Sequence, residues 1–328
     1  MRKFLLYTIV ILGITGLFSC DDDFNILDEY QDITIVYGLL NPDSTTYIKI
    51  NKAFLGEDNA LVMARVEDSS LYRKKLQVTL EGWQNNDLQQ SYQLDTISIG
   101  NKEDGIFYNP YQLLYYTNEP LNSEYNYKIQ VLVNDNKTVT AETGLIGDFS
   151  IIRPIAAYEY INFLTNENIM NYFEFMSPAN GKRFDALIRF NYKEKSLGQD
   201  TITRYFNWGL GTIIADNTEG NREFRLGYKP VSFYSLCEQN IPYDDAAKEQ
   251  EVVYREPLSV DFIISVANEE FNTYMEVNGT SSGIIQVKPE YTNINNGLGL
   301  FASRYNKKMV KLLHNEALYN LRQLNLKF

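Results

Sequence analysis

The chain has 328 residues, with 42 acidic and 30 basic side chains, and its formal net charge is −12. A balance this acidic repels a phosphate backbone, so we expect no nucleic-acid partner. The length allows two domains of ordinary size, each with its own hydrophobic core. Aromatic residues make up 14% of the chain, mostly as 25 Tyr and 18 Phe, and this composition favours β-strands.

The amino-terminal segment predicts export and a lipid anchor. A short basic start precedes an apolar run over residues 4–18, which at about 15 residues is shorter than the roughly 20 that span a bilayer. The run closes on Leu17-Phe18-Ser19-Cys20, which resembles the lipobox of bacterial lipoproteins. This resemblance implies a signal peptide at residues 1–19 and acylation of Cys20. An ordinary secretory signal with an incidental cysteine is the alternative.

Residues 20–31 are expected to form an acidic tether between the lipid and the folded protein. In an extended conformation the tether would span about 35 Å, enough to hold a folded body clear of the lipid head groups. Its three adjacent carboxylates, Asp21, Asp22 and Asp23, could suggest a metal site. Because a tether has no rigid frame to fix coordination geometry, we interpret them as a solvated charge run and predict no metal site.

Alternation of apolar and polar residues predicts an immunoglobulin-like sandwich over residues 32–146. Seven or so strands fall in this region at intervals of about 10 to 20 residues, as in antiparallel sandwiches. The clearest stripe is 125–133, and the turn at 134–136 then returns the chain as a hairpin. The run 121–127 resembles the entry to the penultimate strand of fibronectin type III domains.

A junction over residues 144–154 is expected to lead into a second β-rich domain, residues 147–328. Period-two strands recur there, and two short helices accompany them, the first with a polar cap. The expected elements are strands at 186–192 and 258–266, and helices at 269–276 (capped by Asn268) and 315–322. A further short helix is expected in the first domain at 59–65. The predicted fold class is therefore mainly β, with a few short helices.

The inventory of reactive side chains disfavours catalysis. Apart from Cys20, the chain has a single cysteine, Cys237, and a single histidine, His314. The usual His and Cys ligands of a zinc site therefore cannot be assembled, and we expect Cys237 to be a buried, inert thiol rather than a nucleophile. Paired carboxylates such as Asp244 and Asp245 leave glycoside hydrolysis as an alternative, since a sequence does not show their separation in space. The sequence predicts a non-enzymatic protein without a cofactor.

Three short motifs resemble the O-glycosylation acceptor of Bacteroidetes, with Ser44, Thr96 and Thr201 as the candidate hydroxyl residues. Each of these residues follows an aspartate, in Asp-Ser-Thr or Asp-Thr-Ile. The motif is permissive, so some copies arise by chance.

Four tyrosines, Tyr108, Tyr111, Tyr115 and Tyr116, cluster around Pro110. Exposed aromatic residues are enriched at protein interfaces, which makes this cluster a candidate interface. The alternative is that the rings fill the core of the sandwich.

Two stretches carry a resemblance to a family. Residues 35–56 begin Ile-Val-Tyr-Gly-Leu-Leu-Asn-Pro, and residues 291–304 are Tyr-Thr-Asn-Ile-Asn-Asn-Gly-Leu-Gly-Leu-Phe-Ala-Ser-Arg. Over nearly the whole mature chain, the sequence resembles the uncharacterised domain-of-unknown-function lipoproteins of Bacteroidetes outer membranes. We expect Gly297 and Gly299 to permit a tight backbone path before Phe301 buries its ring.

The resemblance implies an outer-membrane lipoprotein, often encoded near TonB-dependent transporters, and it implies no catalytic residue. In the same bacteria, acidic residues after the lipidated cysteine resemble a surface-export signal, a role that Asp21, Asp22 and Asp23 would fill. We therefore expect a surface lipoprotein that binds a ligand or serves as an accessory to such a transporter. The alternative is a structural, assembly or adhesion component of the cell envelope.

Overall fold

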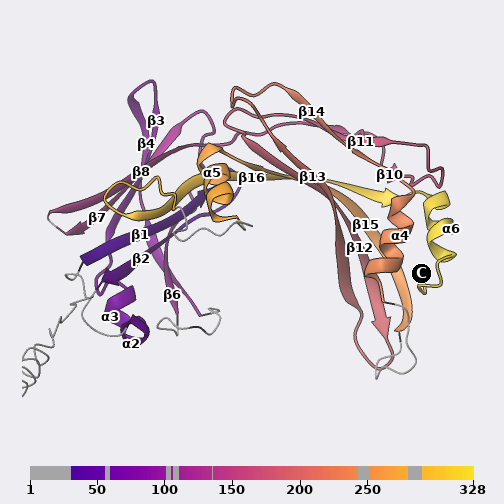
Figure 1. The fold of residues 1–328 in the computed structure, drawn as a ribbon, viewed down its shortest axis with the longest axis horizontal. Helices are drawn as coiled ribbons and strands as arrows, with labels where there is room; N and C mark the ends of the chain where they lie inside the picture. Colours follow the sequence, from indigo (N-terminus) through magenta and orange to yellow (C-terminus); the bar gives the residue numbers. More distant parts are fainter. Residues whose placement is uncertain are drawn as a thin grey trace, which may run out of the picture.

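The computed structural model describes residues 31–55, 60–100, 105, 111–134, 136–242, 252–279 and 290–328. The expected signal peptide, Cys20 and the three aspartates after it lie outside the described residues. The predicted mainly β class is confirmed. Figure 1 shows two β-rich bodies, one at each end of a long strand, β16 (Leu298–Leu313). No helix in the described part of the chain is long and apolar enough to cross a bilayer.

The first body is a sandwich of eight strands from the amino-terminal part of the chain. These strands are β1 (Gln31–Leu40), β2 (Thr46–Leu55), β3 (Gln77–Gln84), β4 (Asp87–Gln93), β5 (Asp95–Ile99), β6 (Gln112–Thr117), β7 (Asn126–Asn134) and β8 (Lys137–Gly144). One sheet has the order β1-β2-β6-β5 and the other has the order β4-β3-β7-β8. This is the strand order of immunoglobulin-like sandwiches, so the predicted fold of this region is confirmed.

The short helix expected at 59–65 is present as α2 (Ala60–Ala64). It is followed by a second short helix, α3 (Glu67–Ser70). The proposed cap, Asn59, lies outside the described residues. Both helices belong to the connection between β2 and β3.

Tyr127, the last residue of the run 121–127, fixes the entry of the chain into β7. Its side chain is fully buried in the sandwich core. Its hydroxyl accepts a hydrogen bond from the backbone N–H of Asn122 at 2.7 Å and donates one to the side chain of Gln90 at 2.7 Å. A tyrosine near the start of this strand that bonds back to the preceding loop is the tyrosine corner of such sandwiches.

The second body packs a small sheet on one face of a larger one. The larger sheet has the order β13-β12-β15-β16 and continues through β16 into β1-β2-β6-β5 of the first body, and the smaller has the order β14-β11-β9. Their new strands are β9 (Ile151–Arg153), β11 (Asn171–Met176), β12 (Arg183–Ser196), β13 (Ile202–Ile214), β14 (Glu223–Tyr228) and β15 (Val252–Ala267). A further short strand, β10 (Tyr160–Ile161), pairs with the end of β16. The strands expected at 186–192 and 258–266 are thus confirmed.

Phenylalanine rings fill the space between these two sheets. Phe173 and Phe175 on β11 point inward, where the ring of Phe175 stacks on that of Phe184 at 5.6 Å. Phe173 meets Phe262 of β15 edge to face at 5.4 Å. Offset and edge contacts of this kind add to the stabilisation from burial alone. The high phenylalanine content of the chain is concentrated in this core.

Two helices, α4 (Ser232–Asn240) and α6 (Asn315–Arg322), complete the second body. A third helix, α5 (Glu269–Asn278), packs on β16 beside the first body (Figure 1). The predicted cap of α5 is confirmed, since the side chain of Asn268 accepts a hydrogen bond from the N–H of Phe271 at 3.2 Å. His314 caps α6 in the same way, with Nδ1 accepting from the N–H of Glu316 at 3.3 Å. The single histidine therefore has a structural role that the sequence pattern did not indicate.

β16 belongs to both bodies. Its first half, from Leu298 to Ser303, pairs in parallel with β1, and its second half, from Arg304 to Lys311, pairs in antiparallel with β15. Ile294 and Phe301 accordingly lie in the core of the first body. The expected second domain, residues 147–328, therefore contributes part of its chain to the sandwich.

The junction lies where the two cores meet. Leu145 belongs to the core of the first body and its neighbour Ile146 belongs to the core of the second. The hydroxyl of Tyr305 on β16 donates to Asp43 of the first body and contacts Asp148 of the junction at 3.3 Å. These bonds connect the β1–β2 turn, the junction and β16.

Candidate functional site

The predicted tyrosine cluster does not form one surface. Tyr108 lies outside the described residues, and Tyr111 is exposed and donates to Glu67 at 3.3 Å. Tyr115 is buried in the sandwich core, where its hydroxyl accepts from the N–H of Leu76 at 2.9 Å. Its neighbour Tyr116 points to the opposite face, because side chains alternate along a strand. The candidate interface is therefore wrong for Tyr115.

An exposed aromatic face does occur on the outside of β1, β2 and β6. Tyr116 stacks on Tyr47 with ring centroids 6.2 Å apart, and Tyr37 and Leu39 of β1 are exposed nearby on the same side. This outward aromatic face borders a cavity of about 580 Å³ that α5 and β16 also line. Among the predicted tyrosines that the structure describes, Tyr116 is the one on this face.

The reactive side chains singled out in the sequence do not assemble into a reactive centre in the described part of the chain. Cys237 is fully buried in α4, and this burial raises the pKa of its thiol. Its expected burial is confirmed. No group of three His, Cys, Asp or Glu side chains among the described residues could hold a metal ion. The paired carboxylates Asp244 and Asp245 lie outside those residues.

The candidate glycosylation residues lie at accessible positions. Ser44 is exposed in the turn between β1 and β2, and Thr201 is exposed just before β13. Thr96 is half-buried on β5, an edge strand. Modification at these three positions remains a prediction.

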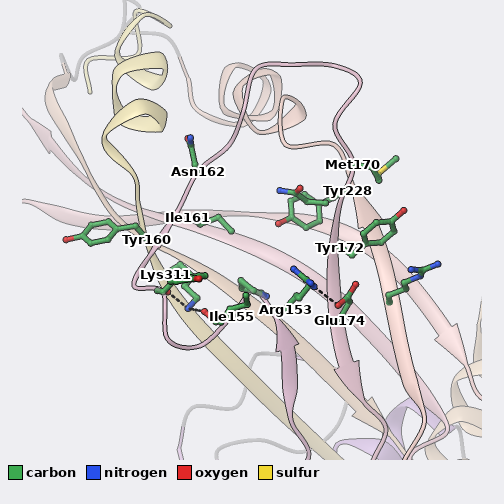
Figure 2. Close-up of a pocket in the computed structure, with 14 residues that line it drawn as sticks. Arg153, Ile155, Tyr160, Ile161, Asn162, Met170, Tyr172, Glu174, Tyr228 and Lys311 are labelled. Carbon is green, nitrogen blue, oxygen red and sulfur yellow. Dashed lines mark hydrogen bonds and ion pairs between the residues drawn. The ribbon is translucent and has the colours of Figure 1, made fainter.

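The second body contains a cavity that combines arginines with exposed tyrosines. Its volume is about 540 Å³, and it lies over the small sheet, between β14 and the segment that contains β10. Figure 2 shows Tyr160 on one side of the opening and Tyr172 on the other. We call this cavity the Arg–Tyr pocket and define it by Arg153, Tyr158, Tyr160, Tyr172, Glu174 and Arg225.

Three charged side chains form a row across the small sheet. Glu174 on the central strand β11 is the register partner of Arg153 on β9 and of Arg225 on β14. Arg153 Nε donates to Glu174 Oε2 at 2.8 Å, the ion pair drawn in Figure 2. All three side chains stand on the outward face, because Phe173 and Phe175 alternate with Glu174 and point into the core. The row has one more positive than negative charge.

Tyr172 forms a flat platform beside this row. Its register partner on β14 is Gly227, and a Cβ atom there would stand 3.4 Å from the Tyr172 ring and 3.2 Å from Met170 Sδ. The ring therefore occupies the space that the missing side chain leaves. The guanidinium of Arg225 lies over the ring, 5.0 Å from its centroid. This cation–π contact holds Arg225 and Tyr172 together as a unit.

Lys311 supports the side of the pocket that residues 155–160 form. Its side chain is buried on β16, and its ammonium donates to the backbone carbonyls of Ile155 at 2.8 Å, Ala156 at 3.3 Å and Tyr158. Burial lowers the pKa of this ammonium. Three carbonyl bonds compensate for its lost hydration, so Lys311 positions the loop that carries Tyr158 and Tyr160.

Tyr228 closes the inner end of the pocket. Burial raises the pKa of its phenol to about 12, an effect that the hydrogen bond with the Asn171 side chain opposes. Its ring meets Trp208 edge to face at 5.5 Å. The phenol at the inner end is therefore neutral, whereas Arg153, Glu174 and Arg225 stand at the outward face.

The sequence pattern did not indicate this pocket. Its residues come mainly from β9, β10, β11, β14 and β16, and none of these five strands was predicted. Residues 171–176 do alternate, but aromatic side chains occur on both faces of that strand. In the sequence, the only local sign of the pocket is that Arg153, Glu174 and Arg225 are each an isolated charge within an apolar segment.

The comparisons with known proteins place the chain in no family. No protein-family model matches it, and no curated relative matches it. Among solved structures, it is similar to the C-terminal globular domain of an oligosaccharyltransferase from Pyrococcus abyssi, at 12% identity and a TM-score of 0.24. The match covers 72% of this chain and 47% of that chain, so this chain spans about half of its length. A likeness this remote transfers neither a substrate nor an activity.

Proposed function

We propose that this protein is a lipid-anchored binding protein of the outer-membrane surface, which captures a small ligand in the Arg–Tyr pocket and presents it to a TonB-dependent transporter. The observation that carries the proposal is one open cavity of about 540 Å³ whose lining includes two arginines and three exposed tyrosines. Cavities that combine ring faces with a few placed charges are typical of small-molecule sites.

The residues of the pocket suit reversible binding. Arg153 is held by Glu174, and Arg225 is held by the ring of Tyr172, so the polar groups lose little freedom when a ligand arrives. Preorganised groups cost less entropy on association than mobile ones. The ring of Tyr172 offers an apolar contact at the same place. A ligand would therefore be bound through one charged contact, to an arginine, and one aromatic contact, to the ring of Tyr172.

The position of the pocket also suits a tethered protein. β1, which follows the expected tether, lies in the first body, whereas β10, β11 and β14 lie in the second body at the other end of β16 (Figure 1). A lipid on Cys20 would therefore not obstruct the opening. The tether would leave the second body free to meet solutes outside the cell.

The proposal predicts that protein taken from its own cells carries a compound. The full chain would be purified under non-denaturing conditions, then denatured, and the released small molecules identified by mass spectrometry. The comparison is a variant with both Arg225→Gln and Tyr172→Ala, with Arg222→Gln as a matched control outside the pocket. We expect a compound that is enriched with the wild type and the control and absent from the double variant. Identical profiles from all three proteins would contradict the proposal.

The outward aromatic face supports a second candidate, a structural or adhesion component of the envelope. Tyr37, Tyr47 and Tyr116 present rings on one side of the first body. Such a component would depend on this face and would tolerate loss of the pocket. Tyr47→Ala should then abolish co-purification of its protein partner, while Arg225→Gln and Tyr172→Ala together leave the phenotype of the cells unchanged.

A further inference from the structure

We infer that the ligand of the Arg–Tyr pocket carries an anionic group, a carboxylate or a phosphate, on a flat or apolar body, with the anion bound by Arg225 and the body against Tyr172. This inference rests on the proposed function and names the chemistry that the same site would recognise.

The pocket carries an excess of positive charge. Its lining contains three cationic side chains, Arg153, Arg225 and Lys311, and one carboxylate, Glu174. Their formal sum is +2, in a chain whose formal net charge is −12. A local excess of one sign within a cavity attracts solutes of the opposite sign. The pocket therefore favours an anion although the protein as a whole repels anions.

Arg225 is the cation of the pocket that can best receive an anion. Glu174 is engaged by Arg153 at 2.8 Å, and Lys311 is engaged by three backbone carbonyls. Arg225 is exposed, and no carboxylate in the described part of the chain forms an ion pair with it. Its guanidinium is thus the cation whose charge is least compensated.

The ring of Tyr172 orients Arg225. The guanidinium contacts this ring with its centre 5.0 Å from the ring centroid. An arginine stacked on a ring still has its planar N–H groups available, and their spacing matches the two oxygens of a carboxylate or phosphate. Tyr172 thereby holds Arg225 ready for an anion without using its hydrogen-bond donors.

The surface beside Arg225 selects the body of the ligand. The ring of Tyr172 is 38% exposed and Met170 is 47% exposed, and both line the pocket next to Arg225. Gly227 keeps this surface flat, because any side chain there would press on both groups. An anion bound to Arg225 would therefore bring whatever it is attached to against an apolar surface. A flat or apolar group gains contact there, whereas a bare inorganic ion does not.

The test uses simple probes on the purified full chain. Benzoate and phenyl phosphate carry the anion and the ring, benzyl alcohol carries the ring alone, and inorganic phosphate carries the anion alone. Affinities would be measured by NMR titration. We expect benzoate or phenyl phosphate to bind about tenfold or more tightly than either partial probe. If benzoate binds more tightly than phenyl phosphate, the pocket prefers a carboxylate ligand, and the reverse order indicates a phosphate ligand.

Variants assign the effect to the pocket. Arg225→Gln should weaken binding of the anionic probes about tenfold or more, and Arg225→Lys should weaken it less, because the charge remains but the planar fork is lost. Arg222→Gln is the matched control, since Arg222 also lies over a ring, that of Phe224 at 5.4 Å, and is not part of the pocket. It should leave the affinity unchanged. Thermal melting would show that each variant is folded.

Two results would overturn the inference. One is equal binding of benzyl alcohol and benzoate, and the other is an equal effect of Arg225→Gln and Arg222→Gln. Failure of this inference is distinguishable from failure of the proposed function. A neutral compound released from native protein would support capture in the pocket and refute an anionic ligand. Anionic probes bound through Arg225, with no compound released from native protein, would support the ligand chemistry and refute the capture role.

Discussion

The carbonyl oxygen of Val36 occupies the space that a Cβ atom would need at Gly299. Gly299 also has a φ of +119°, a backbone conformation that L side chains rarely adopt. The two residues are register partners in the parallel pair of β1 and β16. This close backbone contact is where β16 joins the first body, so the connection between the two bodies depends on a residue without a side chain.

Gly299→Ala should therefore destabilise the protein severely. The added methyl group would both clash with Val36 and strain the backbone, and we expect a loss of about 3 kcal/mol or more in the free energy of unfolding. Gly209→Ala on β13 is the matched control, because no atom lies within 4 Å of its Cβ position. Chemical denaturation of both variants would check the prediction, and similar midpoints would contradict it.

Loss of the Tyr127 hydroxyl should weaken the first body specifically. Tyr127→Phe keeps the buried ring but leaves the N–H of Asn122 and the side chain of Gln90 without their shared partner. Removing one member of a buried hydrogen-bonded set costs about 1–3 kcal/mol. Tyr319→Phe, at a residue that is 64% exposed, should have no measurable effect. Urea denaturation monitored by far-UV circular dichroism would compare the two, and an unchanged midpoint for Tyr127→Phe would refute the role of the corner.

Glu270 should make stability depend on pH. Burial is the largest influence on its carboxyl group and raises its pKa above the ordinary value of 4.5, although hydrogen bonds from Thr143 and Asn268 oppose the shift. A raised folded-state pKa means that the charged form destabilises the folded protein. The wild type should therefore lose stability as the pH rises from about 4.5 through the folded-state pKa.

Glu270→Gln should remove this loss, raising the melting temperature at pH 7 and leaving it unchanged at pH 4. The neighbouring Glu269→Gln is the control, because Glu269 is exposed and forms an ion pair with Lys182 at 3.1 Å. It should lower the melting temperature slightly or leave it unchanged at pH 7, since exposed pairs contribute little. A lower melting temperature for Glu270→Gln at pH 7 would mean that the charged carboxylate stabilises the folded protein, contrary to this prediction.

The sequence predicted the elements whose side chains alternate cleanly. Residues 258–266 have apolar residues on one face and polar residues on most of the other, and they became β15. The cap at Asn268 and the path of Gly297 and Gly299 before the buried Phe301 followed from local chemistry, and the structure contains both. Local rules suffice where the signal and the contact lie within a few residues.

The site was missed because it depends on long-range contacts. Lys311 reaches the carbonyl of Ile155, a residue 156 positions earlier in the chain. Arg153, Glu174 and Arg225 become neighbours only through the pairing of β9, β11 and β14. The prediction of a tyrosine interface was wrong for Tyr115 for a simpler reason. Tyr115 and Tyr116 are adjacent in sequence, so a strand directs them to opposite faces.

Lipidation of Cys20 remains a prediction from the sequence, and one substitution tests it. Cys20→Ala should abolish incorporation of a palmitate analogue and leave a precursor or a soluble protein. Ser44→Ala, in the exposed turn between β1 and β2, is a control that should be labelled like the wild type. Undiminished labelling of the Cys20→Ala protein would contradict the anchor.

The measurement that tests the central claim most directly is hydrogen–deuterium exchange of the full chain, with and without the compound released from native protein. Binding in the Arg–Tyr pocket predicts slower exchange in β11, β14 and residues 153–162, and no change in β1, β2 and β6. The double variant with Arg225→Gln and Tyr172→Ala should show no protection at all. Protection confined to the outward aromatic face of the first body, or equal protection of the double variant, would contradict the claim that this pocket is the binding site.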